Sequence, residues 1–412
     1  MRMTLKRSSQ LLLVSAASLL TAGFLAACST ATVDFVYVTS AKAAGANNYG
    51  EIDVFEINSG SGKMRTIPTS PFPSGGRNPV SEALAPDNTN LYVANQDDNS
   101  IVQFVIGHDG KLYPQNTVNT PGIFPVAITT SGSYLFVTDL YQPLPTCSSG
   151  APCSGSVAVF PILTAAQAKA LTPSQPADTL GTPIVNASVS NSYWPLTLPS
   201  NPTHILVPTA IKAIASGAYV YVAAYDSTTS GGYIFGYSVG SDGTLTALNS
   251  GTPYAAGTHP SGIAAAADGS VLYVTDQGGA SVYSFTVASG ALSPVSGSPF
   301  AAGNQPSAVT VDGTGKYVYV ANLQDSNLTA YTSSNGVLTS IGVYPVGEQP
   351  VAMGIDPSLN QYMFVVNFLG STLNGFQING STGALLTSQF SPWGTHANPT
   401  AVAAIPHNGQ KL

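Results

Sequence analysis

Charged side chains are scarce in this sequence. Asp, Glu, Lys and Arg make up only 8% of its 412 residues, where about a quarter is usual for soluble domains. Neutral polar residues must therefore cover much of the surface. The formal net charge is −7, which argues against nucleic acid and against anionic membrane surfaces as partners. A hydrophobic content of 44% argues against a disordered chain.

Side chains that commonly bind metals are also few, with three cysteines and five histidines. The sequence contains no His-x-Glu or paired-His spacing typical of zinc sites. It also lacks a Gly-x-Ser-x-Gly elbow. The glycine-rich pieces SGGR and SGSG indicate turns, because no helix with a suitable lysine follows them, as a phosphate loop requires. We therefore expect no metal and no cofactor.

The first 27 residues have the pattern of a secretory signal. Arg2, Lys6 and Arg7 precede an apolar run that ends at Ala27, as in signal peptides. A transmembrane anchor is the alternative, but the run is short for a span. Three of the twelve Lys and Arg residues lie in this segment, so nine remain beside nineteen acids.

The segment Leu25-Ala26-Ala27-Cys28 resembles the bacterial lipobox, in which the cysteine is diacylated and becomes the new N-terminus. The resemblance implies that Cys28 is lipidated and that residues 28–33 form a tether. We expect an exported lipoprotein of the bacterial cell envelope, held to the membrane by its N-terminal lipid. Ser29 after the cysteine favours the outer membrane in bacteria that have one.

The other two cysteines, Cys147 and Cys153, stand in the segment CSSGAPC. The five residues between them can close a small loop, and an exported protein meets an oxidising compartment. A metal pair is the alternative, but no histidine stands near them in the sequence. We expect a disulfide.

One short phrase recurs along the chain. NLYVAN at residues 90–95 is repeated in similar form six more times, and five of the seven phrases end in Asn or Asp. The spacing from a preceding proline to the tyrosine is thirteen residues in four units: Pro79 to Tyr92, Pro208 to Tyr221, Pro260 to Tyr273, and Pro306 to Tyr319. Since Asn and Asp at strand ends bond nearby backbone and start turns, we interpret them as part of the scaffold.

The repeat predicts an all-β fold, a seven-bladed β-propeller of four-stranded blades, over residues 34–410. Each unit contains four short apolar or alternating runs, and the Tyr or Phe positions recur at 44 to 55 residues with one spacing of 85. Such periods are typical of propellers. The long spacing indicates an insertion at about 163–203 with one helical turn. The last proline run completes the first unit, so the C-terminal strand should close the ring.

Seven repeats of this type resemble the lactonase-like propeller family, which includes 6-phosphogluconolactonase, and the YVTN repeats of microbial surface proteins. The resemblance covers roughly residues 34–410 and implies the scaffold more than the chemistry. The residues before the prolines should surround the mouth of the central channel. Polar candidates for ligand binding at this mouth are Asn78, Asp97, Asp98, Gln305, Gln349, His396 and Asn398.

Glu82 breaks the pattern of the innermost strands. The third residue after the proline is apolar in the other six units, namely Ile128, Ile211, Ile263, Val309, Met353 and Val402. Burial should raise the pKa of a carboxyl group there, which suits a general acid or base. A bond from Glu82 to Arg77 or to the backbone, which would only stabilise one blade, is the alternative.

Two functions are consistent with these features. The first is a monomeric binding module whose channel mouth holds an envelope protein, a glycan or a small molecule. The second is a lactone hydrolase acting on a sugar lactone, in which Glu82 activates water and Arg77 or His259 donates to the oxyanion. Convergence of these three side chains on one pocket would favour the second.

Overall fold

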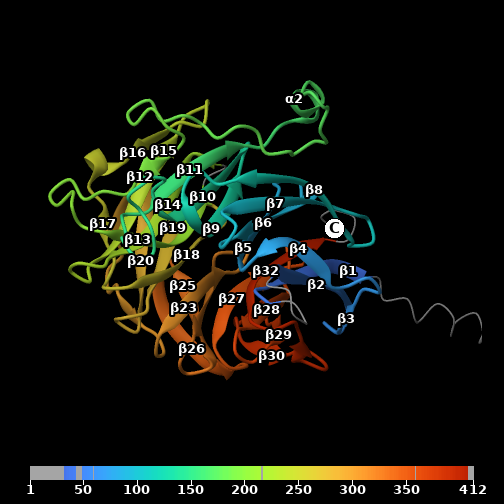
Figure 1. Ribbon diagram of the computed structural model, residues 1–412. Helices are drawn as coiled ribbons and strands as arrows, with labels where there is room; N and C mark the ends of the chain where they lie inside the picture. Colours follow the sequence, from blue (N-terminus) through green and yellow to red (C-terminus); the bar gives the residue numbers. More distant parts are fainter. Residues whose placement is uncertain (1–31, 43–48, 59, 215–216, 358, 407–412) are drawn as a thin grey trace, which may run out of the picture.

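The computed structural model describes residues 32–406 apart from 43–48, 59, 215–216 and 358. The predicted lipid site at Cys28 and the signal segment lie outside the described residues. The described strands form seven antiparallel sheets arranged around a centre (Figure 1). The innermost strands contact one another in a closed cycle, in the order β32, β5, β9, β13, β18, β23, β27 and back to β32. The prediction of a seven-bladed propeller is therefore confirmed.

The first three blades are numbered along the chain, with their strands given from the channel outward. Blade 1 contains β32 (Pro399–Pro406), β1 (Thr32–Ser40), β2 (Tyr49–Asn58) and β3 (Met64–Thr66), with β4 (Phe72–Arg77) also paired to β2. Blade 2 contains β5 (Pro79–Leu84), β6 (Asn90–Asn95), β7 (Ser100–Ile106) and β8 (Leu112–Asn119). Blade 3 contains β9 (Ile123–Ser131), β10 (Tyr134–Tyr141), β11 (Ser156–Pro161) and β12 (Trp194–Pro195).

The remaining four blades follow the same order. Blade 4 contains β13 (Leu206–Ile214), β14 (Tyr219–Asp226), β15 (Gly232–Val239), β16 (Leu245–Ala247) and β17 (Tyr254–Ala255), with the short helix η2 (Asn249–Gly251). Blade 5 contains β18 (Pro260–Ala265), β19 (Val271–Asp276), β20 (Ser281–Ala288), β21 (Ala291–Pro294) and β22 (Phe300–Ala301). Blade 6 contains β23 (Pro306–Val311), β24 (Tyr317–Asn322), β25 (Asn327–Ser334) and β26 (Val337–Pro345). Blade 7 contains β27 (Pro350–Ile355), β28 (Tyr362–Asn367), β29 (Thr372–Ile378), β30 (Leu385–Thr387) and β31 (Trp393–Gly394).

Blade 1 closes the ring, as the sequence predicts. Its innermost strand β32 comes from the C-terminal end of the described chain and pairs antiparallel with β1 from the N-terminal end, so that Val38 stands opposite Val402. Hydrogen bonds between the two ends of the chain therefore hold the circle shut. The pairing also leaves no free strand edge at the junction of the first and last blades.

The aromatic residue of each repeated phrase packs between neighbouring blades. Tyr92, Tyr221, Tyr273 and Phe136 are completely buried. A buried tyrosine needs a partner for its hydroxyl group, and the turn of the next blade supplies one. The hydroxyl of Tyr221 donates to the carbonyl of Gly290 at 2.7 Å. Equivalent bonds run from Tyr37 to Gly110 and from Tyr319 to Gly383.

The Asn or Asp at the end of the phrase holds the loop that leads into the innermost strand. The carboxylate of Asp276 accepts from the backbone of His259 at 2.8 Å, and Asn322 accepts from Gly303 at 3.0 Å. The residue three positions before the proline is glycine in these blades, because a Cβ there would lie under 3.0 Å from the Asn or Asp side chain. The pairs are Gly76 with Asn95, Gly122 with Asp139, Gly257 with Asp276, Gly303 with Asn322, and Gly347 with Asn367. The predicted scaffold role of these residues is confirmed.

The insertion lies between β11 and β13 at the periphery of the ring (Figure 1), and its Asp178 accepts hydrogen bonds from Thr89 and Asn90 of blade 2. It contains the short helix α2 (Ala165–Lys169), which begins with a capping box at Thr164 and Gln167. It also supplies the outermost strand of blade 3, where the indole of Trp194 donates to the carbonyl of Leu245 in blade 4 at 3.0 Å. The insertion therefore connects blades 2, 3 and 4.

Candidate functional site

The centre of the propeller holds a cavity of about 620 Å³ that is lined by the innermost strands. The third residue after the proline contributes to its wall in all seven blades, namely Glu82, Ile128, Ile211, Ile263, Val309, Met353 and Val402. The alignment of the repeat therefore located these positions correctly. A volume in this range is typical of sites for small ligands.

Glu82 lies in this channel with one of its carboxyl oxygens unpartnered. The hydroxyl of Thr39 in blade 1 donates to Oε2, while Oε1 is buried and has no hydrogen-bond partner in the described part of the chain. Burial raises the pKa of Glu82 to about 8, against smaller opposing effects of hydrogen bonds from Thr39 and the backbone of Ala403. The carboxyl group is therefore mostly protonated at neutral pH, and it can donate a hydrogen bond to a ligand.

Lys212 is a second ionisable residue in the channel wall, and the sequence analysis missed it. It stands four residues after Pro208 and pairs with Tyr221 in β14. The equivalent residues of the other blades, identified by the same register, are Ala83, Thr129, Ala264, Thr310, Gly354 and Ala403. A comparison of the fourth residue after the proline across the seven blades identifies Lys212 in the same way that the third identifies Glu82. Burial lowers the pKa of its ammonium group.

Arg77 bonds Asp98 and not Glu82, so the alternative of a Glu82–Arg77 bond is wrong, whereas the alternative of a bond from the backbone to Glu82 is met by Ala403. The guanidinium Nε of Arg77 donates to Asp98 at 2.6 Å, and its backbone N–H donates to the same carboxylate at 2.7 Å. Next to it, the Asn78 amide donates to Asp97 at 3.1 Å. These residues form an exposed network of their own, and neither Arg77 nor Asp98 lines the channel cavity.

His259 is also separated from Glu82. Its ring stacks on Tyr225 with the ring centroids 4.1 Å apart. Its Nδ1 is buried without a hydrogen-bond partner among the described residues, and the residue does not contribute to the wall of the channel cavity. The structure thus gathers Glu82 and Lys212 in one cavity, but it does not bring Arg77 or His259 into that cavity.

His396 contacts two carboxylates of blade 1. Its Nδ1 lies 2.8 Å from Asp53 and its Nε2 lies 3.2 Å from Glu51, while its backbone N–H donates to Asp53. It occupies the position three before Pro399, where five other blades have glycine. This is possible because the phrase of blade 1 ends in the small residue Ser40.

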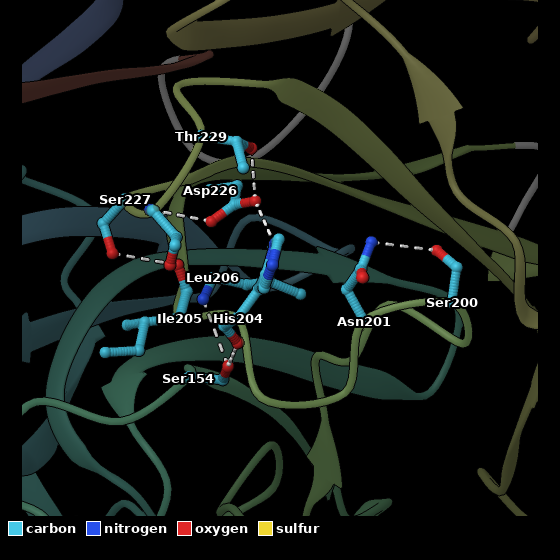
Figure 2. Close-up of polar contacts among 10 residues, drawn as sticks. Ser154, Ser200, Asn201, His204, Ile205, Leu206, Asp226, Ser227 and Thr229 are labelled. Carbon is cyan, nitrogen blue, oxygen red and sulfur yellow. Dashed lines mark hydrogen bonds and ion pairs between the residues drawn. The ribbon is translucent and has the colours of Figure 1, made fainter.

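A second contact between a histidine and a carboxylate lies in blade 4, where the insertion returns to the sheet. Figure 2 shows His204 facing Asp226, with 2.6 Å between Nδ1 and Oδ2, and Thr229 donating to the same oxygen. Burial alone would raise the pKa of Asp226, but these hydrogen bonds and that of Thr228 outweigh it and lower the pKa to about 2. Figure 2 also shows Ser154 bonded to the backbone of His204 and Leu206. The pair thus anchors the end of the insertion.

The remaining candidates sit at the repeated position before the proline. Asn78, Gln305, Gln349 and Asn398 have φ between +51° and +56°, a left-handed conformation that asparagine adopts more readily than most residues. Gln305 is exposed, while the other three are half-buried. Their conformation serves the blade turn, and a ligand role for their side chains stays a prediction.

A disulfide joins Cys147 and Cys153, whose Cα atoms are 5.5 Å apart. Within the described residues, no group of three or more His, Cys, Asp or Glu side chains is arranged to hold a metal ion. No helix in that part of the chain has both the length and the apolar character needed to cross a bilayer.

The fold is that of a seven-bladed β-propeller with a central channel. A family model described as "Lactonase, 7-bladed beta-propeller" matches residues 46–140 and 291–398, so the expected resemblance is confirmed. No curated protein matches the chain.

Solved structures give the same fold. A candidate 6-phosphogluconolactonase from Bacteroides fragilis shares 19% identity with a TM-score of 0.68, covering 92% of this chain and 99% of its own. The periplasmic gluconolactonase of Pseudomonas aeruginosa shares 18% identity with a TM-score of 0.67, covering 90% and 99%. At this level of identity the likeness shows the fold alone.

Proposed function

We propose that the protein is a binding module that holds a small polar ligand in its central channel. The observation that carries this proposal is the buried, unpartnered Oε1 of Glu82 in the wall of a 620 Å³ cavity. Buried polar atoms are usually hydrogen-bonded, and a ligand hydroxyl or carbonyl group would complete the bonding of this carboxyl group.

The cavity wall exposes more polar than apolar surface, which suits a ligand with several polar groups. Most of its residues are Ala, Val, Ile, Ser and Thr. Several hydroxyl groups already bond to the protein; for example, Ser261 donates to the carbonyl of Pro306 and Ser307 to that of Pro350, each at 2.6 Å. Glu82 and Lys212 are the ionisable groups of the wall and are therefore the groups best placed to orient a ligand.

Lactone hydrolysis is the second candidate. The observation that favours it is the pKa of about 8 for Glu82, since a general base works best when its pKa is near the operating pH. The gluconolactonase from Pseudomonas aeruginosa, which has the same fold, adds support by analogy only. The donor for the oxyanion would be Lys212 in place of Arg77 or His259, because only Lys212 shares the cavity.

Two substitutions at Glu82 separate these functions. Glu82→Gln resembles the protonated carboxyl group, so it should preserve ligand binding but abolish base catalysis, whereas Glu82→Ala should weaken both. Calorimetric titration and turnover assays of the purified full chain with a panel of sugars, oligosaccharides and sugar lactones would measure them. Glu348→Ala, in an exposed loop, is the control. Binding that is unchanged in Glu82→Ala would contradict the channel site, and turnover lost in Glu82→Gln would favour the hydrolase.

We also propose that the protein is a lipoprotein of the bacterial cell envelope, anchored at Cys28. The support is the sequence pattern of residues 25–28 alone. Metabolic labelling with an alkyne fatty acid should mark the wild-type chain and leave Cys28→Ala unlabelled and unanchored. Labelled Cys28→Ala would contradict the proposal.

A further inference from the structure

Lys212 is the unusual cation of this protein. The other lysines and arginines in the described part of the chain are exposed, except Lys111, which forms an ion pair with Asp109. Lys212 is half-buried in the channel wall. No carboxylate within the described residues forms an ion pair with it. In an acidic protein of low charge, a lysine amino group in the wall of the central cavity without an acidic partner requires an explanation.

Glu82 does not neutralise Lys212. The two residues lie in blades 2 and 4, and burial is the only cause of the altered pKa of Lys212. Glu82, in turn, is mostly protonated at neutral pH, since its pKa is about 8. They are the only ionisable residues in the cavity wall of the described chain. Burial therefore disfavours the charged form of both groups, and no negative charge in the cavity wall would repel an anion that binds beside Lys212.

We propose that Lys212 binds the carboxylate of a small organic monoanion in the channel, while Glu82 bonds a hydroxyl or carbonyl group elsewhere on the same molecule. This inference rests on the proposed binding function and names its ligand class. Buried charges are normally paired, and an ammonium-to-carboxylate hydrogen bond is one of the stronger polar contacts in proteins. A single lysine matches one negative charge, so a phosphorylated ligand with two charges fits less well.

Competitive amine labelling of the purified full chain tests the inference without any substitution. Cyanate is small enough to enter the channel, and mass spectrometry reports the labelling rate of each lysine. Glucuronate and lactate should slow the carbamylation of Lys212 in a saturable way. Glucose, which matches glucuronate but has no carboxylate, should not. Lys169 and Lys316 are exposed and should label equally under all conditions.

Substitution provides an independent measurement. Lys212→Met should weaken glucuronate binding at least tenfold, about 1.4 kcal/mol, and Lys212→Arg should recover part of the affinity because it restores the charge. Circular dichroism would check that each variant folds. Equal affinity of wild type and folded Lys212→Met for glucuronate would overturn the inference.

The possible failures are distinguishable. If a neutral ligand binds in a way that depends on Glu82 while no carboxylate protects Lys212, the anion inference fails and the binding module stands. If no member of either panel binds, both fail. If cyanate does not label Lys212 in the free protein, the inference also fails, because an ammonium group that a small reagent cannot reach cannot hold a ligand.

Discussion

The hydroxyl group of Thr39, in the strand of blade 1 next to the ring closure, donates a hydrogen bond to the carboxyl group of Glu82 in blade 2. The bond connects the blade made from both ends of the chain to the blade that carries the candidate site. The stability of the closure and the position of the carboxyl group therefore depend on the same contact.

Thr39→Val should test this coupling. The substitution keeps the shape of the side chain but leaves both oxygens of Glu82 without a side-chain donor, and an unsatisfied buried polar group costs about 1–3 kcal/mol. Urea unfolding should show a loss of stability of that size. Thr39→Ser, which keeps the hydroxyl group, should lose less, and equal losses in the two variants would argue that the hydrogen bond is unimportant.

Stability should depend on the ionisation of Glu82. The folded-state pKa of about 8 lies above the ordinary value of 4.5, so the folded protein binds more protons than the unfolded chain between these values. The stabilisation that protonated Glu82 gives to the folded protein is fully present below about pH 4.5 and is lost as the pH rises through 8. The free energy of unfolding of Glu82→Gln relative to wild type should therefore increase by a few kcal/mol from pH 4.5 to pH 9.

Asp139, whose pKa burial raises to about 7, is present in both chains. It therefore cancels in the comparison of Glu82→Gln with wild type. Parallel pH profiles for the two proteins would show that Glu82 titrates normally.

The glycines before the prolines should tolerate no side chain. A Cβ at Gly303 would lie under 3.0 Å from the buried Asn322, and overpacking of this kind typically costs about 1–3 kcal/mol. Thermal unfolding of Gly303→Ala should show the loss. Gly380→Ala is the matched control, because a Cβ at Gly380 meets nothing within 4 Å. Similar unfolding temperatures for the two variants would contradict the proposed packing.

The tyrosine contacts between blades should be measurable one at a time. Tyr221→Phe removes the donor to the carbonyl of Gly290 in a completely buried site. A loss of about 1 kcal/mol is expected in chemical unfolding. Tyr113→Phe, at a side chain that is 48% exposed, should unfold like wild type, and a Tyr221→Phe variant as stable as wild type would show that the bond contributes nothing.

The repeat made the fold predictable because the same register recurs in every blade. One alignment predicted the blade number, the closing strand, the insertion with its helix, and the channel position of Glu82. The alignment could not predict contacts made by loops that differ between the blades. Arg77 precedes Glu82 by five residues, but its guanidinium group donates to Asp98 in the loop after β6.

Lys212 was missed for a different reason. Glu82 stands out at the third residue after the proline, but the cavity is lined by several consecutive residues of each innermost strand, and Lys212 is the fourth. Neighbouring residues of a strand point to opposite faces of the sheet. The innermost strand of each blade nevertheless borders the channel along its edge, so residues of both orientations line the cavity.

The direction of β1 has a consequence for orientation. In the pairing of β1 with β32, Asp34 stands opposite Pro406, and Ser40 stands opposite Pro399 at the channel mouth. The described chain therefore begins on the face opposite the mouth. If Cys28 carries the lipid, its tether would place that far face toward the bilayer, and the proline ends of the innermost strands would point away from the membrane.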